Sequence, residues 1–173
     1  MNDKSRADGS PNVIFLQDVL DQAFGRDSTR VICPITDAFV RHHGALGGFV
    51  RVWIQSSGLT PEAIIERVRA LPGVAFALDR DEACRRFDLP ADREGDVAVI
   101  GDANTVIGAR ETEHDLSNLT DARLRSHGAV AESRVPFILS RPLNVDYAQR
   151  AASGGLKSHQ IFDFAINGIG DPA

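Results

Sequence analysis

The chain has 173 residues, of which 43% are hydrophobic and 25% are charged, and its formal net charge is -5. This composition is that of a globular protein able to bury a core. The negative charge argues against nucleic acid as a partner, because a phosphate backbone selects for basic surfaces. No apolar run approaches the roughly 20 residues of a membrane helix, so we expect no membrane partner either.

Two cysteines, Cys33 and Cys84, fit reduced thiols rather than a disulfide framework. The opening residues carry charge but no apolar stretch behind it, so they do not form a secretory signal. We therefore expect a cytoplasmic protein.

Residues 1–12 are polar and predict a loop or tail. An apolar run begins at Val13, and from Phe15 to Phe24 the apolar residues recur at helical spacing. This pattern predicts an amphipathic helix, with Asn12 as its N-cap and Gly25 as its end. Residues 30–35 and 49–54 are apolar and β-branched, which predicts two strands.

A helix is predicted after Thr60, because a capping residue precedes a proline and then apolar residues at helical spacing. Residues 74–78 predict a strand, and Asp79 is expected to cap a short helix. This succession of strands and helices indicates a compact α+β unit.

The later part of the chain contains further short apolar runs. Residues 95–101 and 105–108 predict the two strands of a hairpin, and residues 109–123 predict a loop. Residues 135–139 predict a strand, and residues 161–168 predict a terminal helical turn.

Four of the five histidines are the first candidates for chemistry, because a neutral imidazole is a common zinc ligand. His127 lies between a small polar residue and a glycine, where it fits either a metal ligand or a surface histidine. His42 and His43 lie near Asp37, but neighbouring side chains usually point to different sides. His114 lies in the long predicted loop, where sites often concentrate.

Two carboxylates complete the set of candidates. Asp115 follows His114 in the same loop, and it too remains a candidate site residue. Asp96 precedes a predicted strand, where a turn residue is a better interpretation than a metal ligand.

Several motifs, taken in order, resemble those of the phosphonoacetate hydrolase family, which belongs to the alkaline phosphatase superfamily. They occupy residues 15–20, 35–37, 42–47, 82–87, 89–93, 124–128 and 161–164 and extend over nearly the whole chain. The resemblance implies an α/β fold: the C-terminal part of an α/β/α sandwich with a small α+β cap. It places residues 1–29 and 116–173 in the remnant of that sandwich and residues 30–115 in the cap.

The resemblance also implies a chemistry. Members of the family use two zinc ions and a threonine nucleophile to cleave the carbon–phosphorus bond of phosphonoacetate, giving acetate and phosphate. Their nucleophile, most metal ligands and the substrate-holding lysines lie in an N-terminal half. We therefore expect this chain to be the C-terminal portion only, with no catalytic residue of its own and with substrate-binding residues that the sequence does not identify.

His127, in the Arg-Ser-His-Gly motif, is the family metal ligand that the resemblance carries over to this sequence. The chain departs from the family at Ala129, where a second glycine is usual, and at Ala38, where a proline is usual. Neither change removes a ligand. One imidazole cannot hold a catalytic zinc, which takes about three protein ligands, so we expect the isolated chain to be inactive.

Three interpretations remain open at this point. The first is a hydrolase of phosphonoacetate or a related small phosphonate. The second is a non-catalytic truncated remnant, or a partner that completes its site with a separate N-terminal half. The third is a small-molecule-binding α+β module, with a pocket lined by Arg41, His42 and His43.

Overall fold

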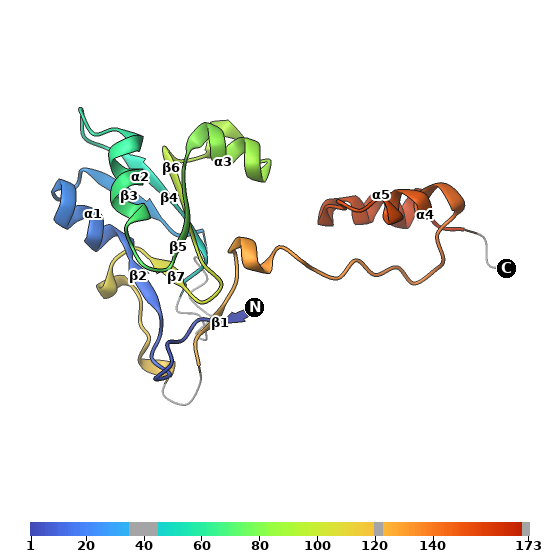
Figure 1. Cartoon of the computed structure of the whole chain (residues 1–173), viewed down its shortest axis with the longest axis horizontal. Helices are drawn as coiled ribbons and strands as arrows, with labels where there is room; N and C mark the ends of the chain where they lie inside the picture. The colour runs from blue at the N-terminus through green and yellow to red at the C-terminus, as the bar shows by residue number, and fades with distance from the viewer. Residues whose placement is uncertain (35–44, 120–122, 171–173) are drawn as a thin grey trace. The chain divides into compact units, whose positions relative to one another are not determined.

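The chain is organised around a four-stranded antiparallel sheet (Figure 1). The computed structural model describes residues 1–34, 45–119 and 123–170. The strands of the sheet lie in the order β3–β4–β6–β5. Their bounds are Thr29–Ile32 for β3, Phe49–Ile54 for β4, Val74–Asp79 for β5 and Val97–Gly101 for β6.

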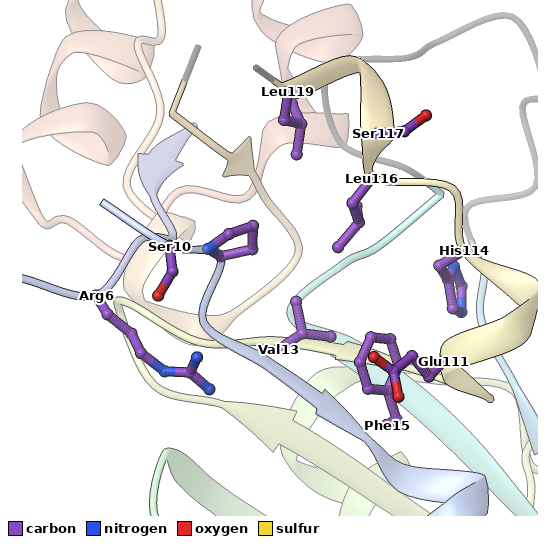
Figure 2. A pocket seen from close by; sticks show the side chains of 10 residues that line it. Arg6, Ser10, Val13, Phe15, Glu111, His114, Leu116, Ser117 and Leu119 are labelled. Atoms are coloured by element: carbon purple, nitrogen blue, oxygen red, sulfur yellow. The ribbon is translucent and has the colours of Figure 1, made fainter. Parts of the chain in front are cut away.

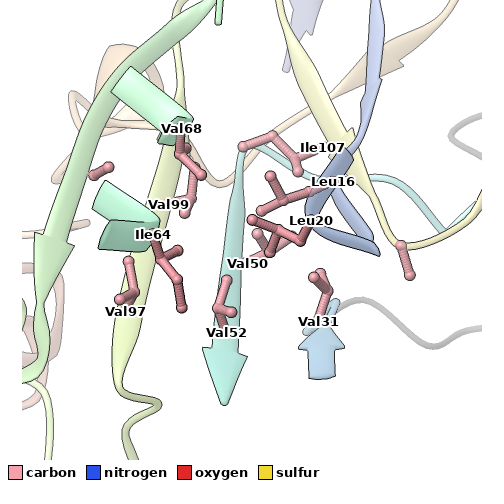
Figure 3. Packing of buried hydrophobic residues seen from close by; sticks show 12 residues of the cluster. Leu16, Leu20, Val31, Val50, Val52, Ile64, Val68, Val97, Val99 and Ile107 are labelled. Carbon is pink, nitrogen blue, oxygen red and sulfur yellow. The ribbon is translucent and has the colours of Figure 1, made fainter. Parts of the chain in front are cut away.

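Helices cover both faces of this sheet, because its strands alternate apolar side chains between the two sides. Helix α1 (Leu16–Phe24) and helix α2 (Pro61–Arg69) pack on one face. Helix α3 (Arg80–Phe87) packs on the other. The first face carries the larger apolar cluster, whose central side chains are shown in Figure 3: Leu16, Leu20, Val31, Val50, Val52, Ile64, Val68, Val97, Val99 and Ile107.

Two helix starts follow their predicted caps. The Thr60 hydroxyl accepts a hydrogen bond from the Ala63 amide at 3.4 Å, and Pro61 is the first residue of α2. The Asp79 carboxylate accepts from the Glu82 amide at 2.8 Å at the start of α3. Each cap satisfies a backbone donor that the first helical turn leaves unpaired.

The predicted start of the first helix is wrong. Residues Val13–Phe15 form strand β2, and α1 begins only at Leu16. Asn12 does not cap the helix, because the residue at the N-cap position is Phe15. The side-chain amide of Asn12 donates to the Asn104 carbonyl and the Thr105 hydroxyl. The predicted end at Gly25 is confirmed, with a φ of 90° that favours glycine.

The predicted hairpin between residues 95–101 and 105–108 is also wrong. Strand β6 already has β4 on one edge and β5 on the other, so it offers no free edge to the following segment. Strand β7 (Val106–Gly108) pairs instead with β2, in parallel, across more than 90 residues of sequence. Periodicity within a segment cannot reveal such a distant partner.

Residues 1–12 are not a tail. Strand β1 (Asn2–Asp3) pairs antiparallel with β8 (Arg125–Ser126), and the side chain of Lys4 is fully buried. Single turns of 3-10 helix occur elsewhere in the described residues, at Ala91–Arg93, Glu111–Glu113, Ser117–Leu119, Val130–Glu132 and Ser158–Gln160.

Residues Arg134–Ala173 form a second compact unit. It contains helix α4 (Val145–Ala152) and helix α5 (Ile161–Asn167), which confirms the predicted terminal helical turn. Phe164 is its buried centre, with the rings of Phe137 and Tyr147 at right angles to it, at centroid distances of 5.2 and 5.0 Å.

The strand predicted for residues 135–139 is absent from this described segment. Val135 is 59% exposed and Ile138 is 80% exposed. Pro136 between them also lacks the amide proton that a strand ladder uses. An apolar run without a sheet to join therefore stays extended and irregular. The division into a sandwich remnant and a cap stays a prediction.

Candidate functional site

His127 follows strand β8 directly, and its imidazole is exposed. The residue before it anchors the strand: Ser126 is fully buried, and its hydroxyl donates to the Leu46 carbonyl at 2.6 Å. The His127 carbonyl in turn accepts from the Gly48 amide at 2.8 Å. These two hydrogen bonds therefore fix the backbone of His127, and with it the position from which the imidazole projects.

The backbone at Gly48 passes very close to the turn that follows His127. A side chain on Gly48 would place its Cβ 2.5 Å from the Ala129 nitrogen, closer than real contacts allow. Gly128 has a φ of 99°, a conformation that suits glycine. The Gly48 carbonyl accepts from Gly101, at the end of β6. This turn is thus joined to the four-stranded sheet through Gly48.

A buried ion pair holds the residues that follow. The Lys4 ammonium lies 2.9 Å from a Glu132 carboxylate oxygen and also donates to the Ala103 carbonyl at 2.8 Å. The other Glu132 oxygen accepts from the Ala129 amide at 2.8 Å. The sequence gives no local signal for this contact, because its two charges are 128 residues apart.

The described residues do not themselves make a zinc site. Within residues 1–34, 45–119 and 123–170, no group of three or more His, Cys, Asp or Glu side chains could hold a metal ion. A catalytic zinc needs about three protein ligands and an open position. His127 alone therefore does not fit the zinc that the resemblance implies.

His114 lies elsewhere and has a structural position. Its Nε2 accepts from the Ala109 amide at 2.9 Å, and its ring stacks on Phe15 with 6.1 Å between centroids. Gly108 passes so close that an added Cβ would meet the imidazole at 2.9 Å. Asp115 accepts from the amide and hydroxyl of Ser117. Among the residues that the structure describes, neither His114 nor Asp115 belongs to a group of three or more possible metal ligands.

The other candidate residues divide into two groups. Asp96 precedes β6 as predicted, where its carboxylate accepts from the Ile54 amide at 2.7 Å and pairs with Arg80 at 2.7 Å. These contacts fit a structural carboxylate. The candidates Asp37, Arg41, His42 and His43, and the family departure at Ala38, lie outside the described residues.

A cleft of about 700 Å³ lies beside strand β2 (Figure 2). Its apolar lining includes Val13, Phe15, Leu116 and Leu119, while Arg6 and other polar residues lie around it. Figure 2 shows Val13 and Phe15 beneath the cleft and the leucines opposite them. No local sequence pattern indicated this cleft, because it lies beside strand β2, whose partner β7 is distant in the sequence.

Cys33 follows strand β3 and is half-buried. Burial and, to a smaller extent, the negative charge of Glu113 raise the pKa of its thiol to about 11, against the lowering effect of a hydrogen bond from the Ala109 backbone. A thiol with such a pKa is almost entirely protonated near neutral pH and is a poor nucleophile or metal ligand there.

Comparisons with known proteins give a consistent relationship. The crystal structure of phosphonoacetate hydrolase from Sinorhizobium meliloti 1021 in complex with phosphonoformate matches 96% of this chain at 42% identity, with a TM-score of 0.79. The complex of the same enzyme with phosphonoacetate matches 96% at 41% identity, with a TM-score of 0.77. Phosphonoacetate hydrolase of Penicillium oxalicum is 56% identical over 32 residues, 18% of this chain.

The mixed α/β fold and these matches first define a class: the relatives of this chain are hydrolases. More narrowly, they are phosphonoacetate hydrolases, which the chain resembles over nearly its whole length. The chain spans 39% of the Sinorhizobium meliloti enzyme and 44% of the Penicillium oxalicum protein. No family model matches it. In the described residues, no helix is long and apolar enough to cross a membrane.

Proposed function

We propose that this chain is the C-terminal portion of a phosphonoacetate hydrolase, which cleaves the carbon–phosphorus bond of phosphonoacetate to give acetate and phosphate. The observation that carries the proposal is the match of 96% of the chain, at 42% identity, to an enzyme crystallised with phosphonoformate. The same enzyme in complex with phosphonoacetate supports a small phosphonate as the ligand.

In this proposal His127 supplies one metal ligand to a site that other residues complete. Its support is the fixed backbone around an exposed imidazole, through Ser126 and Gly48. The described residues do not fit zinc by themselves. We therefore assign this chain a ligand-supplying role and derive no catalytic step from it. The nucleophile and the remaining metal ligands would come from a polypeptide equivalent to the part of the relatives that this chain does not match.

The wider architecture belongs to the same proposal. We place residues 1–29 and 116–173 in the remnant of an alkaline-phosphatase-like sandwich and residues 30–115 in its cap. The parallel pairing of β2 with β7 joins the two parts across the proposed boundary. The cytoplasm is the proposed compartment, supported by the two free thiols of Cys33 and Cys84.

The test is calorimetric titration of zinc into the purified chain, with and without a supplied polypeptide. We call this polypeptide the complement: the portion of the Sinorhizobium meliloti enzyme that this chain does not match. Tight binding of zinc is expected only with the complement, and His127→Ala should weaken it by at least about tenfold, since even indirect partners of a metal ligand contribute that much. Equal zinc affinity with and without His127 would overturn the proposed role.

A binding module that uses Arg41, His42 and His43 is the competing interpretation. It predicts that phosphonoacetate binds the chain without zinc or the complement, and that replacing His42 and His43 by alanine abolishes binding. The proposal made here expects no such binding. Calorimetric titration of phosphonoacetate into the chain alone distinguishes the binding module from the metal-ligand role.

A further inference from the structure

Strands β2 and β7 form a two-stranded parallel sheet with three residues in each strand. The outer edge of β7 is bridged by Gly47, which pairs with Ile107. In the part of the chain that the structure describes, β2 has no neighbouring strand besides β7. Parallel sheets normally have several strands and covered faces, so this pair has the form of an incomplete sheet.

The ladder shows which backbone groups β2 leaves at its outer edge. The Val106 amide donates to the Asn12 carbonyl, and Val13 is aligned with Val106. In a parallel ladder, alternate residues of one strand bond to the neighbour. The amide and carbonyl of Ile14 therefore face β7, while those of Val13 and the amide of Phe15 face away from it. Phe15 is also the N-cap residue of α1, so its carbonyl belongs to the first helical turn.

The cleft in Figure 2 lies next to this edge and could hold side chains of a segment bound there. Val13 and Phe15 line it from the strand, and Leu116 and Leu119 line it from the 109–119 loop. Val13 and both leucines also pack against the small buried cluster around Leu46. An extended segment beside β2 would thus find backbone partners at the edge and an apolar surface for alternate side chains, as in strand addition.

We propose that the outer edge of β2 and the adjoining cleft bind an extended strand of the complement. The inference rests on the proposed function and names the docking surface for the missing part of the enzyme. Well over half of the Sinorhizobium meliloti enzyme lies outside the match, although the match takes in almost all of this chain. This chain matches 39% of its relative, and its parallel sheet is incomplete. In this proposal, a strand from the unmatched part of the enzyme completes the sheet.

The test is amide hydrogen exchange on the full chain, measured by NMR with and without the co-expressed complement. The Ile14 amide should be protected in both samples, because it already bonds within the ladder. The amides of Val13 and Phe15 should exchange at least about tenfold more slowly only with the complement, since opening of a new hydrogen bond must precede exchange. Binding of the complement without slower exchange at Val13 and Phe15 would overturn the proposal.

Two variants of one position supply a matched control. Val13→Pro removes the outward amide proton, while Val13→Ala shortens the side chain and keeps that proton. We expect Val13→Pro to bind the complement about tenfold more weakly than Val13→Ala, the typical effect of one hydrogen bond. Equal binding by the two variants would contradict strand addition. Protection of both amides through self-association, detected as a dimer by light scattering, would also contradict it.

The His127→Ala variant separates this inference from the proposed function. His127 is not part of the β2 edge or of the cleft lining. The variant should therefore bind the complement with unchanged protection at Val13 and Phe15, whether or not His127 is a zinc ligand. Loss of zinc binding with retained protection leaves strand addition intact, while loss of protection with retained zinc binding overturns it alone.

Discussion

The Lys4 ammonium and the Glu132 carboxylate form an ion pair at 2.9 Å, with side-chain exposures of 0% and 9%. This pair links the first strand region of the chain to the turn that follows His127. Burying two charges costs several kcal/mol each, so the pair persists because each partner also has backbone hydrogen bonds. The position of the candidate ligand thus depends on a residue near the other end of its unit.

Removal of one partner of this pair should strongly destabilise the chain. Lys4→Met leaves the Glu132 carboxylate buried without its cation, and we expect the free energy of unfolding to fall by about 3 kcal/mol. Urea denaturation followed by circular dichroism measures the change. Arg85→Met is the matched control, because its pair with Glu82 is exposed, and a change of about 0.5 kcal/mol or less is expected. Equal effects would show that the Lys4 pair is not buried in solution.

Gly48→Ala should also destabilise the chain, because the new Cβ would lie 2.5 Å from the Ala129 nitrogen. Overpacking of this kind costs about 1–3 kcal/mol, and here the obstacle is backbone that cannot rotate away. The thermal midpoint measures the effect. Gly170→Ala is the control, since its nearest contact would be an ordinary 3.4 Å. An unchanged midpoint in Gly48→Ala would contradict the close approach of the two turns.

The raised pKa of Cys33 predicts a pH-dependent stability. Because burial, together with the charge of Glu113, raises the pKa from the ordinary value of 9.0 to about 11, the folded chain holds this proton more tightly than the unfolded chain. The resulting stability is complete below pH 9.0 and is lost as the pH rises from there to about 11. Urea midpoints measured across this range check the sign, and Cys33→Ser should remove this contribution. A midpoint in the unaltered chain that rises over the range, relative to Cys33→Ser, would contradict it.

In the second unit, hydrogen bonds from Asn167, Tyr147 and Arg150 lower the pKa of the Asp163 carboxyl. This interaction stabilises the folded state at a pH above the ordinary value of 3.8 and is lost as the pH falls through the lowered pKa. NMR titration of the carboxyl carbon should give a midpoint below 3.8. Asn167→Ala should move it upward, while Gln149→Ala, an exposed change on α4, should not. A midpoint above 3.8 in the unaltered chain would be the contrary result.

Local sequence signals predicted the elements that depend on local chemistry. The start of α2 follows from Thr60 and Pro61, and the start of α3 from Asp79, because each cap acts within one helical turn. Strand β4 was equally clear from its β-branched and aromatic residues. These elements need no knowledge of the rest of the chain.

Distant pairings were beyond the reach of the same reasoning. With Asn12 taken as the N-cap, Val13–Phe15 is expected to open the first helix, but β7 supplies these residues with a parallel partner. Lys4 belongs to a polar segment until Glu132 and the Ala103 carbonyl surround it. For the candidate site, the resemblance identified His127 and no spacing rule did. The backbone contacts that fix this residue, from Leu46 and Gly48, became visible only in three dimensions.

The most direct measurement is phosphate release from phosphonoacetate, with zinc present, by the chain co-expressed with the complement. We expect release from the combination, none from either polypeptide alone, and a loss of at least about tenfold with His127→Ala in the combination, as expected for a metal ligand. Zinc-dependent release by the 173-residue chain alone, or full activity of the combination without the imidazole at position 127, would contradict the role proposed here.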